Sequence, residues 1–405
     1  MNMSEQKSTP HVLPINPVML SWARDSIGLT QEEVVVRAHS KWKGFDVSWV
    51  KSWEEGRILP TISQLEFLGG LYRRPIATFL IPKPPQEPRL PKDFRTIDSV
   101  DVKGLSVNAR LAVRWARSVQ RNADFLFSTS GNEHKLLIPR VKSSEDPVVL
   151  SEQLREESGI TIELQKQSSS PSAFFEMLRS WAERMGILVL KTPPKFSFSL
   201  DEARAFSFVD VEPYIILINN SDDPAARNFS LLHELGHILL RESGVCGSFI
   251  NSQHSGKGFV SLIEQFCNAL ASNFLIPVSV FNDYIPKGVV IDDDILLEKV
   301  LKSVSFQLKV SKHSVLKRLL QEKLITKKMY SSKVMFWRSN PIQKKKITGI
   351  STKPHETIMK SNGNTFTGLV VDSMHKGLIT STQAAEYLVT REKYIPALEE
   401  VLSKR

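Results

Sequence analysis

Cysteine is scarce in this 405-residue sequence, which contains only Cys246 and Cys267. Two cysteines cannot build the disulfide scaffold of a small secreted domain, and this scarcity is typical of a reducing cytoplasm. No apolar run approaches the roughly 20 residues that a helix needs to cross a bilayer. The polar N-terminal stretch 1–14 lacks the apolar core of a secretory signal. We therefore expect a soluble cytoplasmic protein with no membrane partner.

Acidic residues are few in the C-terminal part of the chain. The formal net charge is +10, but residues 299–405 contain 21 Lys and Arg against 7 Asp and Glu, a charge of +14. The remaining residues therefore sum to −4. A basic segment of this kind binds nucleic acid or an acidic partner, or it serves only as a solubilising surface. Charge alone leaves both interpretations open.

Internal repeats are absent at periods of 20–50 residues, and the length suggests two or three domains. Five prolines between Pro82 and Pro91 predict a semi-rigid linker. We expect a mainly α fold with a small β-sheet, divided into an N-terminal helical domain (1–82), a Pro-rich linker (83–102), a central domain (103–285) and a basic helical C-terminal domain (286–405).

Helix signals are clear in the N-terminal domain. Thr30 is placed to cap a helix, with Glu33 as its capping-box partner, and Asp46 is placed to cap the next helix, 47–54. A longer segment, His39 to Phe45, separates these two helices. Further along, the patterns predict helices at 105–127, 147–158, 172–185, 228–241 and 261–276, and strands at 187–190 and 215–218. Beyond Pro286 the pattern is helical again, interrupted at Lys344–Lys346 and by a loop at 361–364.

The sequence His233-Glu234-Leu235-Gly236-His237 contains the motif H-E-x-x-H. On a helix, residues four apart lie on one face, so both imidazoles can reach a single Zn²⁺. Glu234 follows the first histidine directly, which places its carboxylate where it can bind the attacking water rather than the metal. The pattern predicts a catalytic zinc site in which Glu234 is the general base.

An open catalytic zinc site needs a third protein ligand. Glu264 is the best candidate, because it lies on the next predicted helix and can face the two histidines. Glu242 is too close to the end of the first helix, and His254 lies in a predicted loop.

The residues around this motif resemble the ImmA/IrrE family of metallopeptidases. The segment 213–219 resembles the strand that leads into the active helix, 227–230 resembles the entry turn, and 264–277 resembles the second helix. The resemblance implies a zincin-like α+β core, zinc bound by His233, His237 and Glu264, and peptide hydrolysis assisted by Glu234. It also implies a protein substrate, such as a transcriptional repressor.

The N-terminal domain resembles helix-turn-helix proteins of the xenobiotic-response-element type. Leu29–Glu33, Trp53–Arg57 and Pro60-Thr61 carry this likeness, and 64–82 with Asp93–Thr96 resembles the subgroup that fuses such a module to the peptidase. In this arrangement Ser48, Lys51 and Ser52 would contact double-stranded DNA. Trp49 among them is unusual for base recognition, and the longer segment after the second helix could tilt the recognition helix. A protein-docking or dimerising role is the alternative.

The C-terminal segment 310–319 resembles a second helix of the helix-turn-helix kind. Ser311 is its expected N-cap, and Lys312, Lys317 and Arg318 would be available for phosphates. A helical subdomain that closes the substrate cleft is an equal alternative. For Cys267, one turn from Glu264, a packing role is favoured over redox sensing.

Two functions from different classes fit these patterns. The first is a zinc endopeptidase that is coupled to a DNA-binding module and cleaves a partner regulatory protein. The second is a DNA-binding regulator or antitoxin-like protein whose zinc site is a sensor or scaffold without proteolysis. Glu234 favours the first, because a purely structural site needs no general base.

Overall fold

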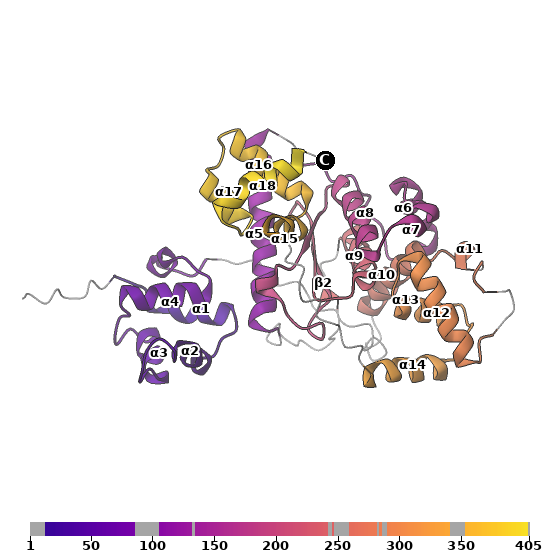
Figure 1. Ribbon diagram of the computed structural model, residues 1–405. Coiled ribbons are helices and arrows are strands. Elements are labelled where there is room, and N and C mark those ends of the chain that lie inside the picture. Colours follow the sequence, from indigo (N-terminus) through magenta and orange to yellow (C-terminus); the bar gives the residue numbers. More distant parts are fainter. Residues whose placement is uncertain are drawn as a thin grey trace, which may run out of the picture. The chain divides into compact units, whose positions relative to one another are not determined.

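The computed structural model describes residues 13–85, 105–131, 134–241, 245–246, 259–281, 283–285, 290–340 and 353–403 (Figure 1). The chain divides into two units, of which unit 1 comprises 1–89 with 103–111, and unit 2 comprises 90–102 with 112–405. Most of the expected linker, the segments 93–96 and 344–346, and residues Glu242 and His254 lie outside the described residues.

Unit 1 confirms the helix signals read from the sequence. The Thr30 side chain accepts a hydrogen bond from the Glu33 N–H, while the Glu33 carboxylate accepts one from the Thr30 N–H. The Asp46 carboxylate caps the third helix through the Ser48 N–H. The elements of unit 1 are α1 (Pro17–Ser26), α2 (Gln31–Ala38), α3 (Val47–Glu54), α4 (Ile62–Tyr72) and the 3₁₀ helix η1 (Ile76–Leu80).

A buried ion pair fixes α1 against α3. The Arg24 guanidinium donates two hydrogen bonds to the Glu54 carboxylate, from Nε at 2.6 Å and from Nη2 at 2.9 Å. Gln31 Nε2 donates a third bond to the same carboxylate at 2.8 Å. Because a two-pronged guanidinium–carboxylate pair has a defined geometry, it sets the angle between the helices. Around it pack the buried side chains of Met19, Leu20, Val34, Val50, Trp53, Leu65, Leu68 and Phe79.

In the part of unit 2 that the structure describes, four short strands form one sheet in the order β1-β3-β2-β4. Strand β1 runs parallel to β3, whereas β2 is antiparallel to both β3 and β4. All side chains of β1, β2 and β3 are buried, and apart from Lys191 and Ser207 all of them are apolar. The strands are β1 (Leu188–Lys191), β2 (Ala205–Phe208), β3 (Ile215–Ile218) and β4 (Val245–Cys246).

Helices make up the rest of unit 2. Helix α9 packs against β2 and β3, and it also contacts α8 and α10. The helices of unit 2 are α5 (Val107–Ser130, shared with unit 1), α6 (Pro147–Ser158), α7 (Ile162–Gln167), α8 (Pro171–Arg184), η3 (Pro194–Phe196), α9 (Pro224–Leu240), α10 (Phe259–Leu275), α11 (Val278–Phe281), α12 (Asp294–Leu308), α13 (Lys312–Gln321), α14 (Lys327–Ser339), α15 (Pro354–Asn362), α16 (Asn364–His375), α17 (Ser381–Tyr387), η5 (Glu392–Tyr394) and α18 (Ile395–Ser403).

Two buried amide side chains tie the helices around α9 together. Asn228 Nδ2 donates hydrogen bonds to the carbonyls of Pro171 at 3.2 Å and Lys309 at 3.0 Å. These bonds join α9 to the start of α8 and to the end of α12. Gln165 Nε2 donates to the terminal carbonyls of α10 and α12, at 3.0 and 2.7 Å. The bonds to Lys309, Leu275 and Leu308 therefore satisfy carbonyls at the C-terminal ends of α10 and α12 that would otherwise be buried without donors.

The structure differs from the sequence-based expectations in four places. Strand β2 was not expected. Helix α9 begins at Pro224, so residues 227–230 lie inside it and do not form its entry turn. The loop expected at 361–364 reduces to Gly363, which separates α15 from α16 with a φ of 82°. One hydrophobic core runs from Ile138 to Val334, so it shows no break at the boundary expected after residue 285.

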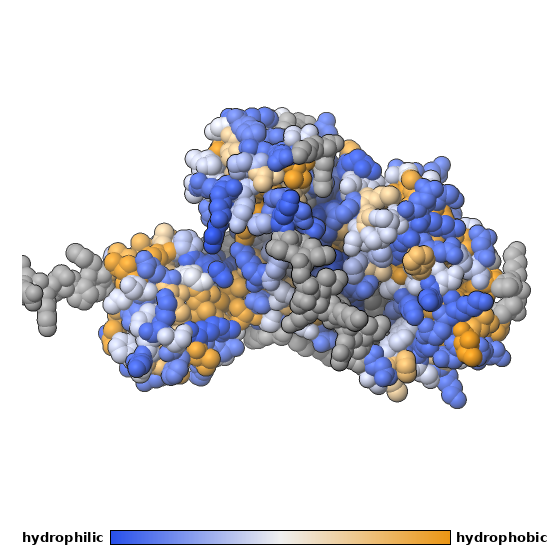
Figure 2. Space-filling model, in the orientation of Figure 1, coloured by the Kyte–Doolittle hydropathy of each residue, from blue (hydrophilic) through white to orange (hydrophobic). Residues whose placement is uncertain are grey.

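Hydrophilic residues cover most of the face of unit 2 drawn in Figure 2, and apolar residues gather at one end of α12. The exposed apolar side chains of this helix include Ile295 and Phe306. Scattered exposure of this kind is ordinary for a folded protein. Among the described residues, no helix is both long enough and apolar enough to span a membrane.

Candidate metal centre

Helix α9 places His233 and His237 on one buried face. The helix begins at Pro224, and the Asp223 carboxylate caps it by accepting a hydrogen bond from the Ala225 N–H at 2.9 Å. It ends at Arg241, which has the left-handed φ of 59°. Because side chains four residues apart are neighbours on a helix, the two imidazoles meet, with their Nε2 atoms 3.2 Å apart.

Helices α9 and α10 approach each other closely at Gly236. A Cβ atom at this position would lie 2.9 Å from Cys267 Sγ and 3.1 Å from Cys267 Cα. Glycine is therefore required for the observed spacing. Glu264 lies one turn before Cys267 on α10, so this contact sets how near its carboxylate comes to α9. Cys267 is a free, buried thiol whose pKa is raised by burial, which supports the packing role.

The Glu264 carboxylate completes a three-sided cluster with the two imidazoles. Its Oε2 lies 3.5 Å from His233 Nε2, and its Oε1 lies 3.3 Å from His237 Nε2. In a tetrahedral zinc site with bonds of about 2.0–2.1 Å, neighbouring ligand atoms are about 3.3 Å apart. The two Nε2 atoms are 3.2 Å apart, each carboxylate oxygen lies 3.3 or 3.5 Å from a different one of them, and the three residues offer ligand atoms within 4.8 Å of one another. The residues present therefore fit a tetrahedral metal ion that has one further position open.

The environment of these groups suits a metal cation. Burial acts to raise the pKa of Glu264, but the interactions with His233 and His237 outweigh it and hold this pKa well below its usual range. The carboxylate thus remains charged. Both histidines are buried, whereas a quarter of the Glu264 side chain is exposed. Solvent is therefore excluded from the cluster on the α9 side but can reach it on the α10 side.

Glu234 lies between the two histidines on α9 and is fully buried. This environment suits the general base expected from the sequence.

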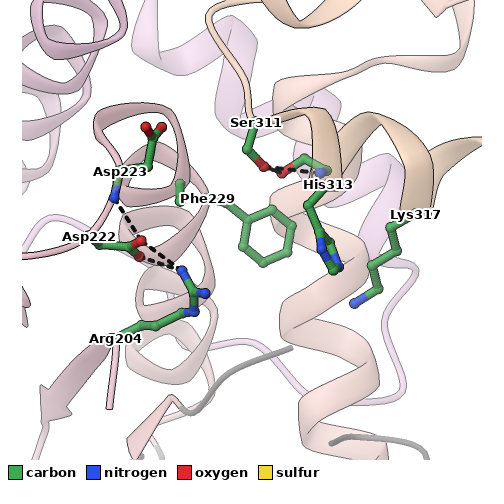
Figure 3. A pocket seen from close by; sticks show the side chains of 9 residues that line it. Arg204, Asp222, Asp223, Phe229, Ser311, His313 and Lys317 are labelled. Carbon is green, nitrogen blue, oxygen red and sulfur yellow. Dashed lines mark hydrogen bonds and ion pairs between the residues drawn. The ribbon is translucent and has the colours of Figure 1, made fainter. Parts of the chain in front are cut away.

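Figure 3 shows a cavity, of about 190 Å³, whose lining residue Phe229 stacks against the ring of His233. Phe229 of α9 separates the side of Arg204 and Asp222 from the side of His313 and Lys317 in that view. The cavity is lined by Arg204, Asp222, Asp223, Ala226, Phe229, Ser311, His313, Ser314 and Lys317. This cavity could not be predicted from the sequence, because its walls come from two segments, 204–229 and 311–317, that are distant in the chain.

The basic residues of α13 have different environments and contacts. Ser311 is its N-cap, as expected. Lys312 is exposed and lies 3.0 Å from the Glu298 carboxylate. Lys317 faces the cavity instead, with its Nζ 3.2 Å from Asn268 Oδ1. The expectation that Arg318 is available for phosphates is wrong, because this side chain is buried and paired with Glu322 at 3.3 Å.

The residues expected to contact DNA belong to α3 in unit 1. Lys51 is exposed and lies 3.9 Å from the Glu55 carboxylate. The Ser48 hydroxyl donates a hydrogen bond to Asp46 within the helix cap, and Ser52 is half-buried. Trp49 is 41% exposed and packs against Phe45 and Trp53.

In this fold the helices α9 and α10 together present two histidines and a glutamate beside a small sheet. Residues 182–320 match the family described as the IrrE N-terminal-like domain (Peptidase_M78), a metallopeptidase family that implies a metal cofactor, typically zinc. This match begins at the end of α8 and continues to α13, so it includes the three clustered residues and Glu234.

Two curated relatives are similar over 78 residues, which is 19% of this chain. Both are named radiation response metalloprotease IrrE. The protein from Deinococcus deserti is 31% identical, with 28% of its length covered, and that from Deinococcus radiodurans is 32% identical, with 24% covered. The chain thus spans about a quarter of the length of these relatives. Together with the family match, the similarities support a metallopeptidase.

Proposed function

We propose that this chain is a zinc-dependent endopeptidase in which His233, His237 and Glu264 hold the metal. The observation that carries the proposal is that one ligand atom from each of these residues lies within 4.8 Å of the others, with the two Nε2 atoms 3.2 Å apart and a carboxylate oxygen 3.3–3.5 Å from each of them. When bound there, Zn²⁺ supplies Lewis-acid polarisation of the scissile carbonyl and makes water a stronger nucleophile.

In this proposal Glu234 moves the protons of the reaction. Its carboxylate takes a proton from the attacking water and delivers it to the leaving amine. The buried histidines keep a fixed orientation because α9 is packed on the sheet, α8 and α10. The exposed edge at Glu264 is the side from which a peptide can enter. The substrate is a partner protein, such as a transcriptional repressor, that is cleaved at a limited number of bonds in the cytoplasm.

Zinc content and affinity provide the first test. We expect one zinc per wild-type chain, measured by elemental analysis and chelator competition. His237→Ala and Glu264→Ala should lose more affinity than the roughly 10–100-fold typical of removing an outer hydrogen-bonding partner. Full zinc binding by Glu264→Ala would show that the proposed ligand set is wrong.

The role of Glu234 is tested separately from metal binding. Glu234→Gln should keep its zinc but lose roughly 10²–10⁴-fold in cleavage rate. The assay compares new protein N-termini, detected by mass spectrometry, in cells that express the wild type or the variant. An undiminished cleavage rate in Glu234→Gln would refute the general-base assignment.

We also propose that α3 of unit 1 contacts double-stranded DNA through Lys51, with Ser48 and Ser52 beside it. The exposed lysine head group on α3 supports this role. Lys51→Ala should weaken binding to duplex DNA and reduce the slope of log affinity against log salt by about 1. Lys83→Ala, at an exposed position outside the helices of unit 1, is the matched control. Equal binding by both variants would favour the protein-docking alternative.

A further inference from the structure

The cavity between α9 and α13 is adjacent to the metal cluster. Phe229, which lines it, lies one helical turn before His233, and the two rings stack with centroids 6.2 Å apart and planes at 26°. On the other side, Lys317 bonds to Asn268, which lies one turn after Glu264 on α10. On α9 the cavity therefore includes a residue one helical turn before the ligand His233, and Lys317 of the opposite wall reaches α10 one turn after Glu264.

The charged groups on one wall of the cavity are already paired within the protein. Arg204 Nη1 donates to both oxygens of the Asp222 carboxylate, at 2.8 and 2.7 Å. The Asp223 carboxylate caps α9 through the Ala225 N–H. Figure 3 shows the Arg204–Asp222 pair on one side of the Phe229 ring.

The polar groups on the α13 wall are engaged in the same way. The hydroxyls of Ser311 and Ser314 share a hydrogen bond of 2.8 Å, and His313 Nε2 lies 3.3 Å from the Tyr330 hydroxyl. Lys317 Nζ donates to Asn268 Oδ1 at 3.2 Å. An occupant therefore need not supply a charge or a hydrogen bond to any of these side chains. The apolar groups of the lining are the Ala226 methyl and the Phe229 ring, over which Lys317 Nζ lies 5.9 Å from the centroid.

The volume limits the occupant to one side chain. A dry cavity of about 150 Å³ lined by apolar side chains holds one benzene molecule. The cavity of about 190 Å³ therefore has room for one branched or aromatic side chain, but not for two residues.

We propose that this α9–α13 pocket receives one apolar side chain of the substrate, the size of leucine or phenylalanine, next to the bond that is cut. The inference rests on the proposed peptidase function, because the metal cluster defines where that bond lies. It assigns a specificity role to Ala226 and Phe229. An acidic substrate side chain would instead have to break the Lys317–Asn268 bond or the Arg204–Asp222 pair.

Acetylated amino-acid hydroxamates test the pocket without requiring turnover, because the hydroxamate group binds zinc while the side chain probes the cavity. Binding of the glycine, leucine and aspartate compounds to the zinc-loaded full chain is measured by titration calorimetry. The leucine compound should bind about tenfold or more tightly than the glycine compound, since its side chain leaves water. The aspartate compound should bind no more tightly than the glycine compound.

Two variants that fill the pocket make the test specific. Ala226→Leu and Ser314→Leu, from opposite walls, should each remove most of the preference for leucine while retaining the glycine compound. Ala173→Leu is the matched control, because Ala173 is also the third residue of a helix that begins with proline, but it is exposed and lies outside the pocket. It should keep the wild-type preference.

Four results would overturn the inference. If the compounds bind alike to the wild type, or if both filling variants keep the preference for leucine, the side chain does not enter this pocket. If the aspartate compound binds most tightly, the pocket is a charged subsite. If no hydroxamate binds at all, the proposed metal centre is wrong, and the pocket inference is then wrong as well. This result distinguishes a failure of the proposed function from a failure of the pocket inference alone.

Discussion

Gly236→Ala should damage the metal centre far more than it damages the fold. The new Cβ atom would lie 2.9 Å from Cys267 Sγ and 3.1 Å from both Cα and Cβ of Cys267. Ordinary carbon–carbon contacts are about 3.5–4.0 Å, so α10 must move away from α9 by roughly half an ångström. Part of this contact is with backbone, which cannot rotate away as a flexible side chain would.

Two opposing effects determine the stability of this variant. Overpacking a core costs about 1–3 kcal/mol, whereas alanine is about 0.8–1.0 kcal/mol more favourable than glycine inside a helix. The net loss in the free energy of unfolding is therefore about 0–2 kcal/mol. Metal binding has much less tolerance, because ligand distances must stay within about 0.2 Å of their ideal values. Glu264 moves with Cys267, so we expect zinc affinity to fall at least about tenfold.

The assay combines denaturant unfolding of the metal-free protein with zinc affinity by chelator competition. Gly368→Ala in α16 is the matched control, because a Cβ there would meet nothing within 4 Å. This control should gain up to about 1 kcal/mol in stability and keep wild-type zinc affinity. If Gly236→Ala behaved like Gly368→Ala in both measurements, the argument that this glycine sets the distance between α9 and α10 would be refuted.

Three further predictions follow from buried or charged contacts. Glu183→Ala removes the nearer of the two carboxylates that pair with the buried Arg179 guanidinium, at 3.2 Å, and leaves Glu176 at 3.6 Å. It should cost about 3 kcal/mol in urea unfolding, and a loss below about 1 kcal/mol would contradict this pairing. Thr30→Ala removes a capping box and should lower the free energy of unfolding of unit 1 by about 1 kcal/mol. Unit 1 should then melt at a lower temperature, and an unchanged melting curve would contradict this prediction. Because the two imidazoles hold the pKa of Glu264 low against the effect of burial, this carboxylate stays charged on mild acidification. Burial lowers the pKa of His233, whereas at His237 the effect of burial is outweighed by Cys267 and Glu264, which raise its pKa well above the ordinary value. Zinc affinity measured from pH 8 to 5 should therefore already fall in the upper half of this range, as His237 binds a proton, and a constant affinity would contradict histidine ligation.

Local rules were sufficient to predict much of the fold from the sequence. The capping box at Thr30 and the N-cap at Asp46 depend only on residues two or three positions away, and both are present. Strand 215–218 was predicted from four consecutive apolar residues and has these bounds. Strand β2 was missed because Ala205 and Ser207 interrupt its apolar pattern, although the sheet buries every side chain in it.

The candidate site was predictable where it depends on spacing within one helix. The i, i+4 rule brings His233 and His237 together, and the structure places Glu264 beside them. The contacts of Lys317 could not be predicted, because a positive charge in a sequence does not reveal its tertiary neighbours. For the same reason Arg318 was expected at the surface but is buried.

The buried amide of Asn228 bears on how the pocket would recognise a ligand. It joins α9, one residue before Phe229, to the Lys309 carbonyl, two residues before α13 is capped by Ser311. The two walls are thereby set at a fixed separation before any ligand arrives, and the Gln165 amide holds the end of α12 in place. A preorganised pocket of this kind selects ligands by their shape, and binding to it loses little conformational entropy. A homologue could then acquire a different preference through one replacement at position 226 or 314, without rebuilding the helices around the metal.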